Sequence, residues 1–136
     1  MELAAIRAFI AQEFPQTNVV IEAVGTKTCR VRQPVDDNHL RPGGTVSGPT
    51  QVLVGDIAIY IAILHELGPV ALAVTTNLSI NFLNKPAANA DLIGECKLLK
   101  LGKRLVIGEV YIYSVGNAEP VAHVVCTYSI PPGAVQ

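Results

Sequence analysis

The chain has 136 residues, of which 50% are hydrophobic and 15% are charged, with a formal net charge of -1. This length suits one domain whose core forms without disulfides or metals, so we predict a single domain over residues 1–136. The apolar excess is more than a small monomer easily hides from water, which predicts a subunit interface. The charge balance excludes the broad positive field that would hold nucleic acid or an anionic membrane.

The cysteines and the first residues indicate the compartment. Cys29, Cys96 and Cys126 are odd in number and form no CxxC pair, so we expect reduced, structural thiols. No basic segment leads into an apolar one near the start, which argues against a secretory signal. The longest nearly apolar run, residues 52–64, is shorter than the roughly 20 residues of a membrane span. We therefore predict a cytoplasmic protein without a membrane partner.

The first third of the chain predicts a helix, extended segments and a loop. Apolar residues between Leu3 and Phe14 recur at spacings of three and four, which predicts a surface helix that ends before Pro15. Residues 18–31 read as extended, with a turn or bulge at Gly25. Residues 33–48 are polar and rich in glycine and proline, so they predict a loop of the kind that often carries function.

Residues 49–67 predict one long helix in the core. Apolar side chains occupy almost every angular position around it, which is typical of a helix buried on all sides. Pro49 is favoured at the first helical position because its missing N–H would be unpaired there. The Gly68-Pro69 pair marks the end of the helix.

After this helix the hydrophobic period changes from 3.6 to 2 and predicts four strands, over residues 77–83, 91–101, 104–113 and 121–130. Turns are predicted at 85–87, 101–103 and 116–117, and such short links between successive strands predict antiparallel hairpins. The fold class is α+β, with an antiparallel sheet curling around the long helix. We expect the fourth side of that helix to meet a second subunit.

Asp56 does not fit its apolar surroundings. An ionised carboxylate inside an apolar helix is costly unless it is paired or lies at a cavity. Two interpretations stay open: Asp56 lies at a wet edge or pairs with an arginine, or it is a catalytic acid that faces a ligand cleft. Gly55 beside it lowers helix propensity, which indicates close approach of another part of the chain.

Glycines precede the start of the same helix, in the segment RPGGTVSGP at residues 41–49. Unpaired N–H groups and the positive end of the helix dipole at such a start can hold a negative oxygen. Glycines before a helix are most often a turn that requires positive φ, so the two interpretations remain side by side.

These motifs together resemble one known family. The segment GGTVSGP, Asp56 nine residues after Ser47, VTTNLSINFLNKP, and LLKLGKRLVIGEVYIY resemble the hotdog-fold thioesterases of the phenylacetate-pathway (PaaI) type, from about Arg41 to Tyr128. The resemblance implies a hotdog fold, an antiparallel β-sheet wrapped around a long central α-helix. It also implies an acyl-CoA substrate and a homodimer that pairs into a dimer of dimers.

The resemblance also implies catalytic residues. Gly48 would polarise the thioester carbonyl through its backbone N–H, and Asp56 would attack the thioester or activate water. Thr75 matches a hydroxyl-bearing position that helps to place the water in some members. In the family, the Asp and the Gly meet across the subunit boundary.

The chain departs from the family pattern before the helix. Ser47 replaces the usual histidine, Pro49 replaces the following glycine, and Arg41 stands where an asparagine is often found. Ser47 can orient the carbonyl or cap the helix. Arg41 can contact a phosphate of CoA, pair with Asp56, or mark a shifted substrate or a lost activity. Lys103 and Arg104, beside a turn, are the further candidates for the phosphates of CoA.

This chemistry requires no metal and no cofactor beyond the CoA of the substrate. Backbone donors stabilise the carbonyl oxygen as it gains charge, and the carboxylate acts as base or nucleophile. The histidines show no metal-ligand spacing. Two alternatives are a non-catalytic hotdog module that binds CoA or acyl-CoA and a hotdog dehydratase with a His–acid pair. Against the dehydratase, His39 is the loop histidine and lies outside the required spacing.

Overall fold

The apolar segment in the middle of the chain forms the core helix. In the computed structural model of the protein, which describes residues 1–132, helix α2 spans Gly48–Leu67. By length and composition this helix could cross a membrane, but 67% of that stretch is buried inside the fold. The high hydropathy of α2 therefore reflects its place in the core.

Both ends of α2 are defined by the predicted residues. The helix starts one residue before the predicted start, because Ser47 caps it and accepts a hydrogen bond from the Thr50 N–H at 3.3 Å. Pro49 follows Gly48 in the first turn. At the other end Gly68 has a φ of 85° and its N–H donates to the Leu64 carbonyl at 2.9 Å, which stops the helix.

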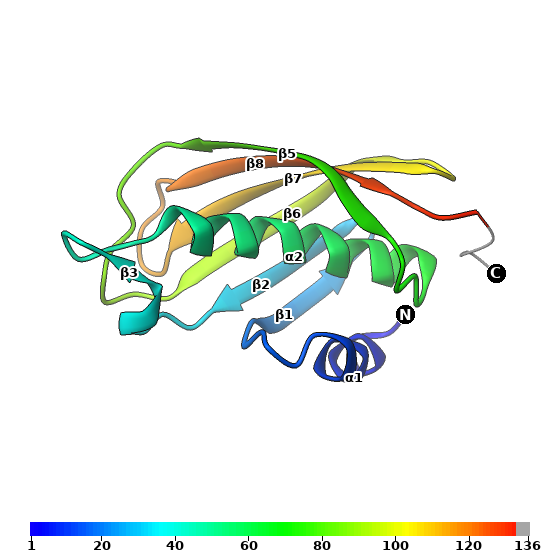
Figure 1. Ribbon diagram of the computed structural model, residues 1–136, viewed down its shortest axis with the longest axis horizontal. Coiled ribbons are helices and arrows are strands. Elements are labelled where there is room, and N and C mark those ends of the chain that lie inside the picture. The colour runs from blue at the N-terminus through cyan, green and yellow to red at the C-terminus, as the bar shows by residue number, and fades with distance from the viewer. Residues whose placement is uncertain (133–136) are drawn as a thin grey trace.

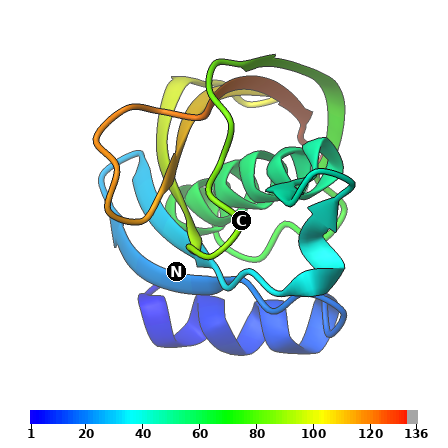
Figure 2. The same ribbon diagram turned by 90° about the vertical axis from the view of Figure 1, so that its left-hand side faces the viewer.

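A six-stranded antiparallel sheet curves around α2 (Figures 1 and 2). Its spatial order is β1-β2-β6-β7-β8-β5. A separate two-stranded hairpin precedes α2, within the predicted loop. The strands are β1 (Val20–Gly25), β2 (Thr28–Gln33), β3 (Leu40–Arg41), β4 (Thr45–Val46), β5 (Val74–Phe82), β6 (Leu92–Leu101), β7 (Leu105–Ser114) and β8 (Ala122–Ser129).

One predicted hairpin is wrong. We expected the strands on either side of residues 85–87 to pair with each other, but β5 pairs with β8 at the opposite end of the β6-β7-β8 meander. Residues 83–91 instead cross the end of the sheet. Three strand spacings amount to about 14 Å, and nine residues reach up to about 30 Å. The link is therefore long enough for the crossover, and its length does not require a hairpin.

Strand β5 lies at the edge of the sheet, and its apolar face is less covered than its alternating pattern predicts. Leu78 and Ile80 are half-buried, and Phe82 is 56% exposed. Nearby, Leu53 of α2 and Val74 at the start of β5 are also exposed. This edge therefore presents both unpaired backbone groups and apolar side chains.

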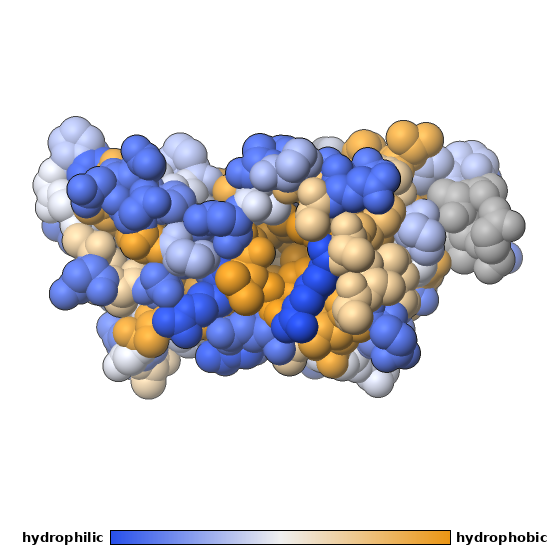
Figure 3. Space-filling view, turned by 90° about the horizontal axis from the view of Figure 1, so that it is seen from below, coloured by the Kyte–Doolittle hydropathy of each residue, from blue (hydrophilic) through white to orange (hydrophobic). Residues whose placement is uncertain are grey.

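Helix α1 (Leu3–Glu13) lies along the outside of the molecule, as predicted, with Ile6 and Ile10 buried against the rest of the fold. The face seen from below in Figure 3 has hydrophobic residues at its middle and to the right of it, with hydrophilic residues between them and over much of the left-hand side. A hollow between α1 and β1 is lined partly by Phe14 and Val20. Across it Arg7 donates to the Ile21 carbonyl at 2.7 Å.

The inner side of the sheet packs against α2. Gly55 makes the closest approach, since a Cβ at this position would lie 2.7 Å from Cγ2 of Val124 on β8. The close approach that the sequence indicated at Gly55 is therefore confirmed. The three cysteines are free and buried, in agreement with the expectation of structural thiols.

Candidate functional site

Asp56 lies in the third turn of α2 and faces strands β5 and β8. Its Oδ1 atom accepts hydrogen bonds from Thr75 Oγ1 at 2.6 Å and from the Tyr128 hydroxyl at 2.9 Å, and Cys126 Sγ lies 3.7 Å away. Among residues 1–132 the Oδ2 atom has no hydrogen-bond partner, and no cation pairs with Asp56. The carboxylate is thus held by neutral donors on one oxygen, while the other stays available.

The donors around Asp56 stay protonated at neutral pH. Burial, with the nearby carboxylate as the second cause, raises the pKa of Cys126 to about 12. The same two causes, in the same order, raise the pKa of Tyr128 well above its usual value. Both groups therefore remain hydrogen donors to Asp56 throughout the physiological range.

A cavity of about 300 Å³ opens beside Asp56. Apart from Asp56, Thr75 and Tyr128, it is lined by apolar or aromatic side chains of α2, of the α2–β5 connection, of the first residue of β5 and of the segment after α1. These are Phe14, Leu53, Ile57, Tyr60, Ala71, Ala73 and Val74. The rings of Phe14 and Tyr60 meet edge to face with centroids 5.4 Å apart, and Tyr60 stacks on Tyr128 at 5.9 Å. The acid group therefore forms the polar end of an apolar cavity.

The start of α2 offers a free backbone donor. Pro49 has no N–H, the Thr50 N–H donates to the Ser47 hydroxyl, and the Gln51 N–H donates to the Ser47 carbonyl at 3.3 Å. The Gly48 N–H has no acceptor among residues 1–132, as is usual at the first position of a helix. Gly48 lines a cavity of about 240 Å³ together with Arg41 and Lys85.

The structure does not bring Gly48 and Asp56 together within one chain. They are eight residues apart on the same helix, which is about 12 Å along its axis at 1.5 Å per residue. They also line different cavities. A single carbonyl group cannot contact both within one protomer.

The other predicted site residues are spread over the two ends of α2. Lys103 and Arg104 lie at the β6–β7 turn and line a cavity of about 470 Å³ that also touches Leu67, at the C-terminal end of the helix. Arg41 lies near the N-terminal end and forms no ion pair within the described part of the chain. The interpretation in which an arginine of the same chain clamps Asp56 is therefore wrong.

Ser47 caps the helix, which is one of the two roles that the sequence left open for it. Its hydroxyl accepts from the Thr50 N–H and lies 2.8 Å from Thr50 Oγ1. Contact between Ser47 and a substrate remains a prediction. Thr75, by contrast, lies directly against the carboxylate that it was expected to assist.

Two residues of the site were missed from the sequence, Tyr128 and Cys126. They alternate with outward-facing residues on β8, so the period of this strand already placed them on its inner face. The pairing of β8 with β5, where Tyr128 is opposite Thr75, is what brings them to the acid group. That pairing is not readable from the strand pattern.

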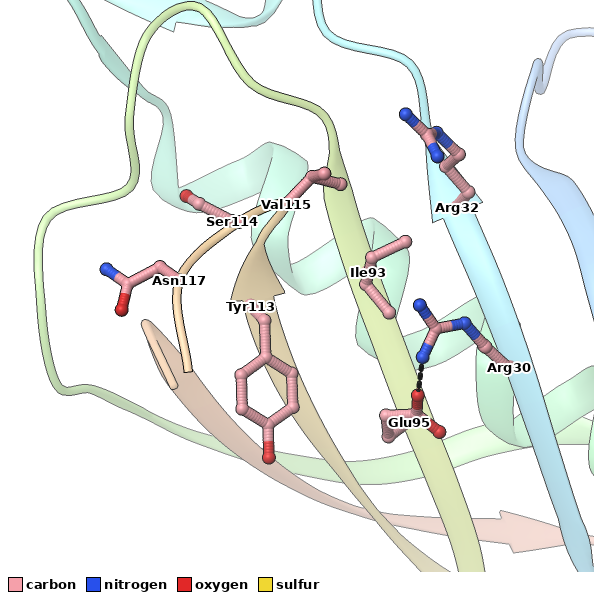
Figure 4. A pocket seen from close by; sticks show the side chains of 9 residues that line it. Arg30, Arg32, Ile93, Glu95, Tyr113, Ser114, Val115 and Asn117 are labelled. Carbon is pink, nitrogen blue, oxygen red and sulfur yellow. Dashed lines mark hydrogen bonds and ion pairs between the residues drawn. The ribbon is translucent and has the colours of Figure 1, made fainter. Parts of the chain in front are cut away.

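A further cavity, on the outer face of the sheet, does not offer free cations (Figure 4). Arg30 pairs with Glu22 and Glu95, and Arg32 pairs with Asp91 at 2.8 Å. The Val35 N–H and Arg32 lower the pKa of Asp91. Within residues 1–132 no group of three or more His, Cys, Asp or Glu side chains is placed to hold a metal ion.

Comparison with known proteins agrees with this architecture. A family model described as the thioesterase superfamily matches residues 43–121. The structure of a candidate thioesterase from Silicibacter sp. is 42% identical, over 97% of this chain and 93% of that one, with a TM-score of 0.90. The predicted hotdog fold is therefore confirmed.

Two more distant structures share the fold. A mutant of the phenylacetic acid degradation protein PaaI from Thermus thermophilus is 20% identical over 86% of this chain and 96% of that one, with a TM-score of 0.74. A Streptococcus mutans protein bound to acetyl CoA is 18% identical over 84% and 89%, with a TM-score of 0.75. A comparison with curated proteins gives no match.

Proposed function

Because the chain belongs to the thioesterase superfamily, we propose that it is an acyl-CoA thioesterase of the PaaI type with Asp56 as its catalytic carboxylate. The observation that carries this proposal is the state of Asp56. Asp56 lies at the edge of an apolar cavity. One of its carboxylate oxygens is fixed by Thr75 and Tyr128, and the other has no hydrogen-bond partner among the described residues. Acetyl CoA bound to the Streptococcus mutans protein supports a CoA thioester as ligand.

The reaction needs water and two groups of the protein. The free Oδ2 of Asp56 takes a proton from water, which attacks the thioester carbonyl, or it attacks that carbonyl itself to give an anhydride that water then cleaves. In both routes the carbon–sulfur bond breaks, and the products are the free acid and CoA thiol. The Gly48 N–H stabilises the carbonyl oxygen while it carries negative charge.

The site requires two chains in this proposal. Gly48 and Asp56 of one chain are about 12 Å apart along the helix, so the donor comes from the partner subunit. The edge of β5 supports such an interface, because its backbone is unpaired on one side and exposed Val74 and Phe82 lie along it. We expect a homodimer through this edge, paired into a tetramer.

The nucleotide end of CoA is assigned to cationic side chains. Lys103 and Arg104 are proposed to bind its phosphates, and Arg41 beside Gly48 is the third candidate. Ser47 remains a proposed contact to the thioester end. No cofactor beyond CoA takes part.

Hydrolysis by the purified protein tests the assignment of Asp56. A panel of aryl-, short- and medium-chain acyl-CoAs is offered, and release of CoA is followed with a thiol reagent, for which the buried cysteines give little background. Asp56→Asn should lower kcat at least about a thousandfold. The matched variant Asp37→Asn, at an exposed carboxylate of a surface turn, should not change it.

Three outcomes separate the candidate functions. Hydrolysis that survives Asp56→Asn removes this residue from the mechanism. Binding of CoA or acyl-CoA by calorimetry, without any turnover, favours the non-catalytic binding module. Hydration or dehydration of an acyl-CoA without release of CoA thiol favours the dehydratase.

The oligomer is tested separately by sedimentation. Asn77→Lys combined with Asn81→Lys places two positive charges on the β5 edge of each copy and should weaken a dimer that forms there. The control combines Asn38→Lys with Asn89→Lys, which adds the same charge at exposed positions elsewhere. If both proteins sediment like the unaltered chain at every concentration, the β5 edge is not the interface.

A further inference from the structure

The β6–β7 hairpin carries a concentration of positive charge. Lys97, Lys100, Lys103 and Arg104 lie within eight consecutive residues, whereas the chain has ten lysines and arginines in all. None of the eleven aspartates and glutamates falls in this segment. All four cationic side chains are exposed. The small net charge of the protein therefore hides a local positive field at one end of the sheet.

These four cations have no ion-pair partner among residues 1–132. Two carboxylates of the same end of the molecule are bound to other groups. Glu109, which is opposite Lys97 in the strand pairing, lies 2.9 Å from His123 Nε2. Glu66 accepts a hydrogen bond from the Lys27 N–H at 3.1 Å. The described part of the chain thus leaves the cations of the hairpin free to meet an acidic partner.

Two exposed leucines accompany the cations on the outer face of the hairpin. Lys97 precedes the buried Leu98, so it points to the opposite face of the sheet. The bulge between Leu98 and Lys100 adds Leu99, which is 53% exposed, and Leu105 at the start of β7 is 44% exposed. Lys97, Leu99, Lys100 and Leu105 are called the hairpin patch below. Apolar side chains beside charged ones are the arrangement of a protein docking site.

The turn of the hairpin connects this patch to a cavity at the C-terminal end of α2. Lys103 and Arg104 line the cavity, and neither lysine of the hairpin patch does. The turn and this end of α2 lie at the same end of the molecule (Figure 1). Leu67, which also lines the cavity, is eleven residues from Asp56 on α2, about 16 Å along the helix axis.

A phosphopantetheine arm has a length that matches this distance. About thirteen bonds separate its phosphorus from its sulfur, which gives a reach of about 15 Å at roughly 3.6 Å for every three bonds. Contacts of roughly 3 Å at each end extend this reach. An arm whose phosphate meets Lys103 and Arg104 therefore brings its thioester to Asp56.

From this charge and this reach we infer that the hairpin patch docks an acidic carrier protein, which presents an acyl group as a thioester of phosphopantetheine. The inference rests on the proposed thioesterase function for the reaction itself. Water attacks the thioester carbonyl, the carbon–sulfur bond breaks, and the free acid and the thiol of the carrier leave. The phosphate of the arm is common to CoA and to the carrier, whereas the hairpin patch contacts the carrier alone.

Other occupants fit the hairpin patch less well. An isologous contact between two copies through this patch would place the same cations against each other. An anionic membrane would meet the cations, but it brings no thioester within reach of Asp56. An acidic carrier protein meets both requirements, because its surface complements the charge and its arm delivers the substrate.

Hydrolysis of two hexanoyl thioesters, one of CoA and one of a purified acidic acyl carrier protein, tests the docking surface. Lys97→Gln combined with Lys100→Gln should raise the KM of the carrier thioester about tenfold and change the KM of hexanoyl-CoA by less than about twofold. Leu99→Ser, at an exposed position that tolerates a polar side chain, should raise the KM of the carrier thioester about threefold. The matched control, Asn38→Asp with Asn89→Asp, changes the net charge equally at exposed positions elsewhere and should change neither KM.

Binding of the carrier protein with a free thiol on its arm separates docking from turnover. Calorimetry should show an affinity that falls about tenfold from about 0.05 to about 0.3 M sodium chloride, because salt screens exposed charges. The Lys97→Gln, Lys100→Gln protein should bind about tenfold more weakly than the unaltered chain at low salt, and its affinity should depend less on salt. A carrier that binds in this way while neither thioester is hydrolysed supports the docking surface and ends the proposed function.

Three results overturn the inference. Hydrolysis of hexanoyl-CoA without binding of the carrier protein removes the docking surface and leaves the proposed function. Equal effects of the lysine pair and of the control pair show that net charge, and not the hairpin patch, governs binding. Sedimentation with phosphatidylglycerol vesicles that the lysine pair abolishes, in a protein that does not bind the carrier, assigns the patch to a membrane surface.

Discussion

Gly55 connects the packing of α2 to the geometry of the acid group, and Gly55→Ala tests this connection. A Cβ at position 55 would lie 2.7, 3.0 and 3.1 Å from three side-chain carbons of Val124, a residue with no exposed surface. Ordinary contacts of a Cβ begin at 3.4 Å. The helix and β8 must therefore separate by about 0.7 Å, or Val124 must leave its preferred position.

The expected cost is the difference between two effects. Overpacking in the buried contact between α2 and the Val124 side chain costs about 3 kcal/mol, at the upper end of its usual range. Alanine is better than glycine inside a helix by about 1 kcal/mol, which offsets part of that cost. We expect Gly55→Ala to lower the free energy of unfolding by about 2 kcal/mol, although the exchange favours a helix.

The same displacement reaches Asp56, the next residue along the helix. Its hydrogen bonds to Thr75 and Tyr128 are 2.6 and 2.9 Å long, and a shift of 0.7 Å lengthens them beyond good geometry. We expect kcat for a good acyl-CoA substrate to fall about tenfold or more. Stability is measured by urea denaturation at one fixed protein concentration, because oligomers unfold in a concentration-dependent way.

A double-mutant cycle decides whether this contact is the cause. Val124→Ala alone should cost about 2 kcal/mol through lost burial and the cavity that remains. In the double variant the new methyl group at position 55 occupies that space, so the total loss should also be about 2 kcal/mol rather than about 4. Additive losses would refute the packing explanation.

Three further predictions concern the site and its surroundings. Thr75→Val and Tyr128→Phe should each lower kcat about ten- to a hundredfold with little change in KM, and Thr75→Ser should retain most activity; a change confined to KM would contradict their role in positioning the acid. Lys103→Ala with Arg104→Ala should raise KM for acyl-CoA and leave the KM of acyl-pantetheine unchanged, which kinetics with both substrates will show. Stability should fall above pH 9, because the Cys126 thiol ionises near pH 9 when unfolded but near 12 when folded, so that the unfolded state binds fewer protons in between; denaturation curves should show Cys126→Ala flattening this slope.

Much of the fold could be predicted from local patterns. The 3.6-residue period ended at Gly68, and the period of 2 that followed located the strands within a few residues. The alternation of β8 separates inward from outward side chains because successive residues of a strand point to opposite faces. Asp56 stood out because a charge within an apolar helix needs partners.

The pairing of the strands was harder to predict from the sequence than their positions. The link from β5 to β6 carries turn residues, yet the strands it joins are separated by β7 and β8. A link of nine residues fits both a hairpin and a crossover, so its composition does not choose between them. The exposure of Phe82 follows from the place of β5 at the edge, which the alternation of its residues does not reveal.

The sequence by itself determined the elements, the burial of α2 and the candidate acid, because each depends on residues close together in the chain. Only the tertiary structure decided that Thr75, Cys126 and Tyr128 surround one oxygen of Asp56, because these contacts join residues 19 to 72 positions apart. It also decided that Gly48 and Asp56 of one chain lie too far apart to share a carbonyl. The rigid rise of the helix fixes that separation.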